Sequence, residues 1–139
     1  MGRGNLCPPS WVYLYALEKE GQQDLDQIAS YLKRWLGPVA LEVRKDFFSH
    51  MLRGIGPEER EENIKCLAKA LAGLKVRNPQ DQDFFPPPLY GEIAYERERI
   101  EEGGGKASGI LYDGYQLQQL CWDWLPPSET SLKHFHLIF

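Results

Sequence analysis

The chain has 139 residues, a mass of 16.0 kDa and a formal net charge of −4, which fits one globular domain and argues against binding of nucleic acid or an anionic membrane. Its 4 Trp, 7 Tyr and 6 Phe can fill a hydrophobic core, so general disorder is excluded. The longest apolar run, residues 11–17, is far shorter than the roughly 20 residues that span a bilayer, and the N-terminus lacks the apolar segment of a signal peptide. The three cysteines, Cys7, Cys66 and Cys121, form no CxxC pair, which favours reduced thiols in a soluble cytoplasmic protein.

The N-terminal part of the sequence predicts a strand, a helix and a second strand. Residues 11–17 are apolar on both faces, which is typical of a strand covered by helices on each side. Residues 24–36 carry apolar side chains at i, i+3, i+4 and i+7, so we expect a helix with Asp24 as its N-cap, paired with Gln27. Residues 39–43 alternate as a second strand, and this order of elements favours parallel pairing.

The segments around these elements are a leader, a helix and several connections. Residues 1–10 read as a loose leader, and residues 44–54 mix charges and aromatic side chains, so we expect them to leave the sheet. Residues 57–73 predict a helix with proline in its first turn. Residues 75–90 form a proline-rich connection, and residues 92–102 predict a helix whose thin apolar face places it on the surface.

The last third of the sequence predicts a loop, two strands and a helix between them. Residues 103–109 are rich in glycine and predict a flexible loop, and residues 109–113 predict a third strand. Asp113 and Gln116 repeat the D-x-x-Q pattern of a helix start, and residues 133–139 alternate as a fourth strand.

Together these elements indicate a single α/β domain over residues 1–139, with a mixed, mainly parallel sheet of about four strands flanked by helices. The sequence stops at Phe139, on an apolar strand residue. Two interpretations stay open, a C-terminal strand inside the sheet or the N-terminal part of a longer protein.

His134 and His136 are the strongest chemical lead, because residues i and i+2 of a strand point to one face and could bind one metal ion. The alternative is that both imidazoles lie on a half-exposed sheet face without a metal. We expect Phe135, Leu137 and Phe139 to pack against the helices, with the histidines on the opposite face. The other side chains that could complete a metal site are His50, Asp113, Cys121 and Asp123.

Tyr112 and Asp113 are candidate ligand-binding residues, because they lie where a predicted strand meets a helix. Ligands of open α/β sheets bind at the carboxyl ends of strands. The alternative for Asp113 is that it only caps the following helix.

A protein partner has two candidate surfaces. The segment 84–90, from Phe84 to Tyr90, places aromatic side chains beside a polyproline stretch and could enter the groove of a partner. It could equally lie across the protein itself as a rigid strap. The edge of the C-terminal strand is the other candidate surface.

Three segments, 88–100, 109–120 and 133–139, resemble an uncharacterised, largely archaeal family of predicted metallopeptidases, and the similarity could cover residues 11–139. The resemblance implies a zinc site similar to that of metzincin-type proteases. The HExxH motif of such a site is absent from this sequence, so no catalytic residue can be carried over and zinc is implied only by the resemblance.

Three functions therefore remain to be compared, and the sequence does not decide whether the protein is an enzyme. The first is a protein similar to the metallopeptidases without a catalytic zinc motif of its own. The second is a non-enzymatic protein-interaction module. The third is a small metal-dependent hydrolase that uses His134 and His136.

Overall fold

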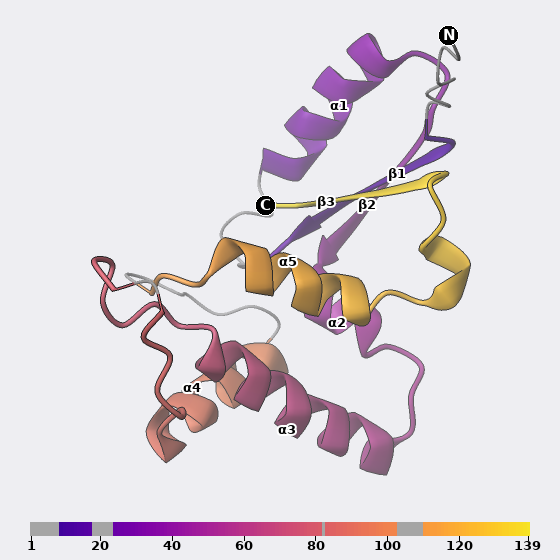
Figure 1. Ribbon diagram of the computed structural model, residues 1–139. Coiled ribbons are helices and arrows are strands. Elements are labelled where there is room, and N and C mark those ends of the chain that lie inside the picture. Colours follow the sequence, from indigo (N-terminus) through magenta and orange to yellow (C-terminus); the bar gives the residue numbers. More distant parts are fainter. Residues whose placement is uncertain (1–8, 18–23, 82, 103–109) are drawn as a thin grey trace, which may run out of the picture.

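Three parallel strands form the sheet of this protein, in the order β2-β1-β3, and helices lie on both of its faces (Figure 1). The computed structural model describes residues 9–17, 24–81, 83–102 and 110–139. The elements are β1 (Trp11–Ala16), α1 (Leu25–Leu36), β2 (Ala40–Asp46), α2 (Phe47–Met51), α3 (Pro57–Gly73), α4 (Tyr90–Glu101), α5 (Gly114–Asp123), the 3₁₀ turn η2 (Pro127–Glu129) and β3 (His134–Ile138). The predicted α/β class with a parallel sheet flanked by helices is confirmed, although the described chain has three strands in its sheet and not four.

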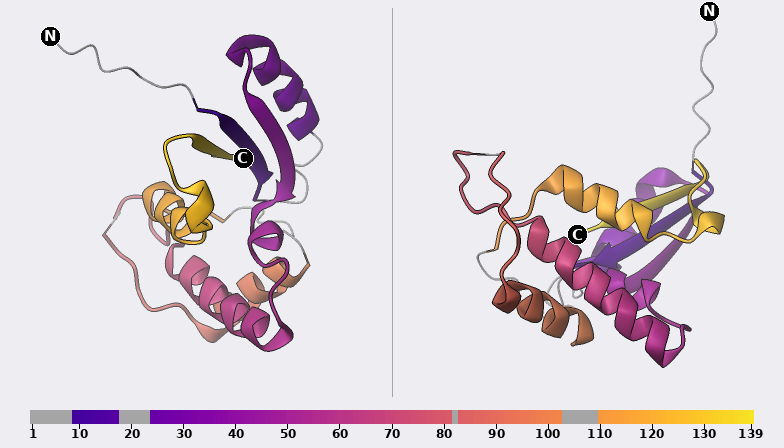
Figure 2. Two further views of the ribbon diagram at one scale, coloured as in Figure 1. Left: turned by 90° about the vertical axis from the view of Figure 1, so that its right-hand side faces the viewer. Right: turned by 60° about the horizontal axis from the view of Figure 1, so that its bottom comes forward.

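β1 is the central strand because it is apolar on both faces. Val12, Leu14 and Ala16 point to one face and pack against Leu25 and Ala29 of α1. Figure 2 shows α1 alone on this side, with the other helices on the opposite side. The strand-helix-strand prediction is thus confirmed, with β1 and β2 paired in parallel.

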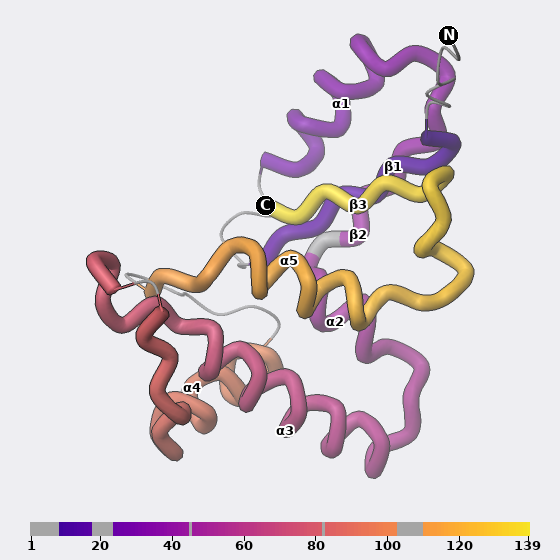
Figure 3. The backbone as a smooth tube through the Cα atoms, in the orientation of Figure 1, coloured from indigo at the N-terminus to yellow at the C-terminus, as the bar shows by residue number. Residues whose placement is uncertain are grey.

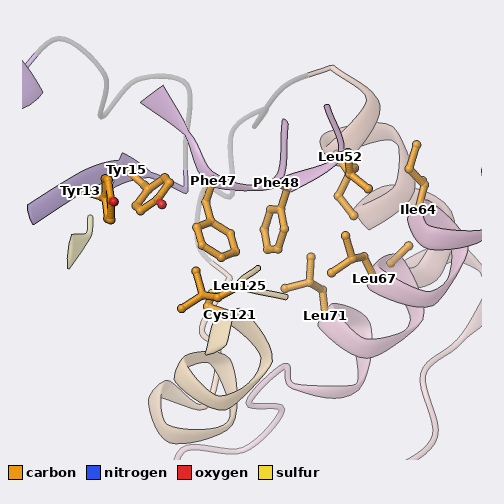
Figure 4. Close-up of a cluster of buried hydrophobic side chains, with 12 residues drawn as sticks. Tyr13, Tyr15, Phe47, Phe48, Leu52, Ile64, Leu67, Leu71, Cys121 and Leu125 are labelled. Carbon is orange, nitrogen blue, oxygen red and sulfur yellow. The ribbon is translucent and has the colours of Figure 1, made fainter. Parts of the chain in front are cut away.

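The opposite face of β1 contributes to a larger core. Tyr13 and Tyr15 begin a continuous run of buried side chains that passes through Phe47 and Phe48 of α2 to α3 (Figure 4). The same run includes Cys121 of α5 and Leu125 just beyond it. The helices α2 and α5 therefore cover this face of the sheet, and α3 and α4 form a further layer beyond them.

Asp24 does not cap α1 with its side chain, so that prediction is wrong. The backbone of Asp24 has φ −96° and ψ −8°, which is a helical conformation, and its side chain makes no capping hydrogen bond. Side-chain capping requires an extended residue, so Asp24 cannot reach back to the free amides. Asp113 is extended, and its carboxylate accepts a hydrogen bond from the Gln116 amide at 2.9 Å, which confirms the predicted cap of α5.

The predicted end of the second strand and the predicted third strand are also wrong. Residues 44–54 do not leave the sheet at once, because β2 continues through Asp46 before α2 begins. The third strand predicted at 109–113 is absent from the described sheet, since Tyr112 makes only an isolated antiparallel bridge with Lys75. The backbone of this stretch pairs with residues 74–76, which follow α3, and this pairing keeps it away from β1.

The helix predicted at 92–102 exists as α4, but it is not confined to the surface. Glu96, Arg99 and Ile100 are buried. The two charged side chains can be buried because Arg99 and Glu96 form an ion pair inside the protein. The glycine loop predicted at 103–109 lies outside the described residues. None of the described helices is both long enough and apolar enough to cross a membrane.

The face prediction for β3 is wrong about burial. Phe135 and Phe139 are each 52% exposed, whereas Leu137 packs on the α1 side of the sheet. His134 and His136 lie on the other face and are half-buried. The tube in Figure 3 shows the chain returning from α5 through η2 to place β3 beside β1.

Candidate functional site

A pocket of about 640 Å³ opens between α5 and β3, on the face of the sheet that carries Tyr13 and Tyr15. Within the described chain, its lining contains no Asp, Glu, Lys or Arg. The volume is within the range of about 300–1,000 Å³ that is typical of small-molecule sites. The lining residues are Phe47, Tyr115, Gln118, Gln119, Cys121, Trp122, Leu125, Thr130, Ser131, Leu132, His134, Phe135, His136 and Ile138.

The two histidines of the pocket are held by tyrosines of the neighbouring strand. In the parallel register, Trp11 pairs with His134 and Tyr13 with His136. The Tyr13 hydroxyl lies 3.0 Å from Nδ1 of His134, and the Tyr15 hydroxyl lies 3.0 Å from Nδ1 of His136. The rings also stack, with Tyr13 and His134 inclined by 6°. Both imidazoles therefore have fixed positions on this face.

His136 belongs to a closed ring of hydrogen bonds that joins all three strands to η2. Arg44 Nη1 donates to the Tyr15 hydroxyl at 2.9 Å, and His136 Nε2 lies 2.8 Å from the carbonyl oxygen of Glu129. The Glu129 carboxylate closes the ring by accepting from Nη1 and Nη2 of Arg44 at 2.7 and 2.6 Å.

The partners in this ring determine where its protons lie. A carbonyl can only accept, so the imidazole of His136 carries a proton on Nε2. The Tyr15 hydroxyl accepts from Arg44 and donates to Nδ1 when this imidazole is neutral. Burial lowers the pKa of His136, which favours the neutral form, with both ring nitrogens engaged.

Arg44 reaches the ring because it is the extra residue of a β-bulge. Leu14 pairs with Val43 and Tyr15 pairs with Lys45, so Arg44 has no partner in the ladder. A bulge changes the direction of a side chain and is frequent beside functional sites. The guanidinium carbon of Arg44 lies 3.6 Å from the centre of the Tyr13 ring, which adds a cation–π contact.

Burial and charge shift the titration of these groups. Desolvation raises the pKa of Tyr15 to about 12, and burial lowers the pKa of His136. The hydrogen bonds that Arg44 donates lower the pKa of Glu129. Burial acts to lower the pKa of Arg44, but the carboxylate of Glu129, which accepts these bonds, raises it above its ordinary value. The Arg44–Glu129 pair is thus ionised, while Tyr15 and His136 are neutral near pH 7.

The metal prediction for His134 and His136 rests on these two side chains alone. The part of the chain that the structure describes holds no group of three or more His, Cys, Asp or Glu that could bind a metal ion. Of the other candidates, Asp113 caps α5 and Asp123 accepts a hydrogen bond from Gln119. The donor set is therefore a poor fit to a zinc site of three or four ligands, and the metal role stays a prediction.

Tyr112 and Asp113 lie apart from the pocket. The Tyr112 hydroxyl donates to Oε1 of Glu96 at 2.6 Å and accepts from Arg99 at 2.7 Å. Lys75 completes this buried cluster through an ion pair of 3.1 Å with Glu96. The cluster anchors the start of α5 to α4, and a ligand-binding role for Tyr112 and Asp113 stays a prediction.

Sequence reasoning missed Arg44 and Glu129, which hold the wall of the pocket. Arg44 lies in the segment 44–54, which is predicted to leave the sheet, and the sequence predicts no role for Glu129. One signal was present: Arg44 directly follows the alternating residues 39–43, and a charged side chain that continues a strand needs a partner where it is buried.

Comparison with known proteins gives a family. The model of DUF7001, a family of unknown function, matches residues 13–139. The chain belongs to this family. The match to DUF7001 includes Arg44, Glu129 and both histidines of the pocket, so the whole ring lies within the shared region. No curated protein and no solved structure matches the chain significantly. Because DUF7001 has no described activity, the resemblance to archaeal metallopeptidases stays a prediction.

Proposed function

We propose that this protein is a non-enzymatic binding module whose α5–β3 pocket takes an uncharged, largely apolar small molecule. The pocket itself carries the proposal, because it combines ligand-sized volume with aromatic walls and a lining free of Asp, Glu, Lys and Arg in the described chain. A charged ligand would lose its hydration there without gaining a partner of opposite charge.

The walls of the pocket are suited to binding because they are already in place. The hydrogen bonds from Tyr13 and Tyr15 fix the two imidazoles, and the pair of Arg44 with Glu129 fixes the turn that leads to Thr130–Leu132. A site whose side chains are held before binding loses less conformational entropy when the ligand enters.

The chemistry of the lining favours binding over hydrolysis. Burial raises the pKa of the Cys121 thiol to about 12, so this thiol is protonated and a weak nucleophile near neutral pH. His136 has both ring nitrogens engaged and is not free to accept a proton from a substrate.

A small metal-dependent hydrolase that uses His134 and His136 remains the second candidate. One observation favours it, namely that His134 and His136 lie on the same face of β3 and line the same pocket. Such a site would need at least one further ligand. We also propose a cytoplasmic location, in keeping with the free thiols of Cys66 and Cys121.

The experiment that tests the binding function is a titration with Nile red, a neutral apolar dye whose fluorescence rises in apolar surroundings. Ser131→Trp places a large side chain at the exposed rim of the pocket, and Trp122→Ala removes part of its wall. The matched control is Trp35→Ala, since Trp35 is exposed on α1, on the other side of the sheet.

We expect saturable binding to the wild type and to Trp35→Ala, weakened about tenfold or more in both pocket variants. Thermal unfolding confirms that each variant is folded. Equal affinity in all four proteins, or binding that never saturates, would overturn the proposed function.

A further inference from the structure

The segment 84–90 carries exposed aromatic and proline side chains that do not line the pocket. Phe84, Pro87 and Tyr90 are all exposed, and Tyr90 is 88% accessible. Phe85, Pro86 and Pro88 are partly buried, and Leu89 is 67% exposed. Three consecutive prolines, Pro86, Pro87 and Pro88, favour a polyproline II helix, which has three residues per turn and no internal hydrogen bonds.

The backbone of this segment agrees with polyproline II geometry. The rings of Pro86, Pro87 and Pro88 fix φ near −65°, and each residue before a proline is driven towards extended ψ. Leu89 has φ −75° and ψ 153°, close to the values of about −75° and +145° of this helix. Residues 84–89 belong to no helix or strand of the described chain. Tyr90 is the first residue of α4 and lies at the end of this extended segment. We call the exposed side chains of Phe84, Pro87, Leu89 and Tyr90 the proline ridge.

The C-terminal end of the ridge is fixed to α4. The Leu89 amide donates to Oε2 of Glu92 at 2.8 Å, and Glu92 is also paired with Arg77. The Leu89 carbonyl accepts from Ile93 at 3.1 Å in the first turn of the helix. The ridge is thus held in its conformation before any partner arrives, which lowers the entropy that binding would cost.

We propose that the proline ridge docks into a groove walled by aromatic rings on a partner protein that recognises polyproline II segments. Such grooves take the flat faces of proline rings and neighbouring apolar side chains, and they exploit a helix that is already formed. This surface is separate from the α5–β3 pocket, so the proposal does not depend on the ligand-binding function.

The negative charge beside the proline ridge indicates which charge the rim of the partner's groove should carry. Residues 78–91 contain Asp81 and Asp83, both exposed, and no Lys or Arg. A groove with basic residues at its rim complements this segment, whereas an acidic rim would repel it. The spacing Pro87-Pro88-Leu89-Tyr90 also places an exposed tyrosine two residues beyond a pair of prolines, where a second shallow pocket of the partner can receive it.

The test uses the full chain and a purified WW domain as the probe, because this domain has an aromatic groove for Pro-Pro segments followed by tyrosine. Isothermal titration is run with the wild type, Pro87→Ala, Tyr90→Ala and Asp81→Asn/Asp83→Asn. The matched control is Tyr31→Ala, since Tyr31 is also an exposed tyrosine but lies on α1. An SH3 domain, whose groove carries acidic residues, is the second probe.

We expect the WW domain to bind the wild type and Tyr31→Ala equally, with a loss of about tenfold or more in Pro87→Ala and Tyr90→Ala. The aspartate variant should bind more weakly to a WW domain with a basic rim, by a few-fold, and this loss should shrink at high salt. Absence of binding to the wild type would overturn the proposal, as would unchanged affinity in Tyr90→Ala or tighter binding to the SH3 domain. Dye binding in the pocket is unaffected by any of these results, so the two proposals fail separately.

Discussion

Glu129→Gln is the sharpest perturbation of the wall that holds the pocket. The substitution keeps the shape of the side chain but removes its charge, leaving Arg44 with only the more exposed Glu42, at 3.2 Å, as an ionic partner. The Arg44 side chain is only 6% exposed and that of Glu129 only 17%, so water cannot replace the lost carboxylate well. Removing one member of a buried pair costs about 3–5 kcal/mol, and the amide oxygen of glutamine still accepts one hydrogen bond. We therefore expect a loss of about 2–3 kcal/mol in the free energy of unfolding.

The assay is urea denaturation together with thermal unfolding, in which this loss lowers the Tm by roughly 6–12 °C for a chain of this size. The matched control is Glu61→Gln. Glu61 is also paired with an arginine, Arg97, at 2.7 Å, but the two side chains are about 40% exposed. A surface pair of this kind contributes less than about 1 kcal/mol.

The same variant should loosen the turn before β3 and weaken Nile red binding in the pocket, because the Glu129 carbonyl and carboxylate both belong to the ring. If Glu129→Gln and Glu61→Gln lower stability equally, the ring does not hold this turn. That result would refute the description of Arg44 and Glu129 as the support of the pocket.

Four further outcomes follow from the structure. Burial lowers the pKa of His136 below its ordinary value of 6.5. The neutral imidazole therefore contributes fully to the free energy of unfolding above about pH 6.5, and this contribution is lost as the pH falls through the lowered pKa. Urea denaturation should show a smaller loss of this free energy at acid pH in His136→Gln than in the wild type. Phe135→Ala should cost only about 1 kcal/mol of unfolding free energy, since this ring is 52% exposed, and a loss above about 3 kcal/mol would show that it is buried in solution. In a Cys7→Ser background, iodoacetamide should label Cys66 quickly and Cys121 slowly, because burial raises the pKa of Cys121 to about 12, and mass spectrometry of the labelled peptides separates the two sites. Zinc titration should show no stoichiometric site, and a site that is lost in His134→Ala would instead support the hydrolase candidate.

The spacing of apolar residues along the sequence was enough to predict the central strand and the helix that follows it. The two apolar faces of residues 11–16 identified the central strand, and the spacing of Leu25 and Ala29 identified the helix that covers it. Sequence spacing carries this information because burial repeats with the period of the element.

The two D-x-x-Q patterns show where local reasoning fails. Asp24 and Asp113 have the same spacing to a following glutamine, yet only Asp113 caps a helix. The difference lies in the backbone, which is helical at Asp24 and extended at Asp113, and the side-chain pattern alone does not report this angle.

The candidate site depended on contacts that the sequence does not show. Arg44 and Glu129 are 85 residues apart, and the bulge that frees Arg44 from the ladder leaves no mark in the residue types around it. Hydrophobicity alone predicted that Phe135 would be buried and His136 would face away. The hydroxyls of the tyrosines on β1 instead bind the imidazoles, which places the histidines on the face of the larger core.

The central claim is that the α5–β3 pocket binds an uncharged apolar molecule, and amide chemical shifts measured during a Nile red titration of ¹⁵N-labelled protein test it most directly. The predicted result is a saturable set of shift changes confined to α5, residues 130–132 and β3, reduced in Ser131→Trp. Shift changes that gather on the exposed face of α1 around Tyr31 and Trp35, or that spread over the protein without saturating, would contradict the claim.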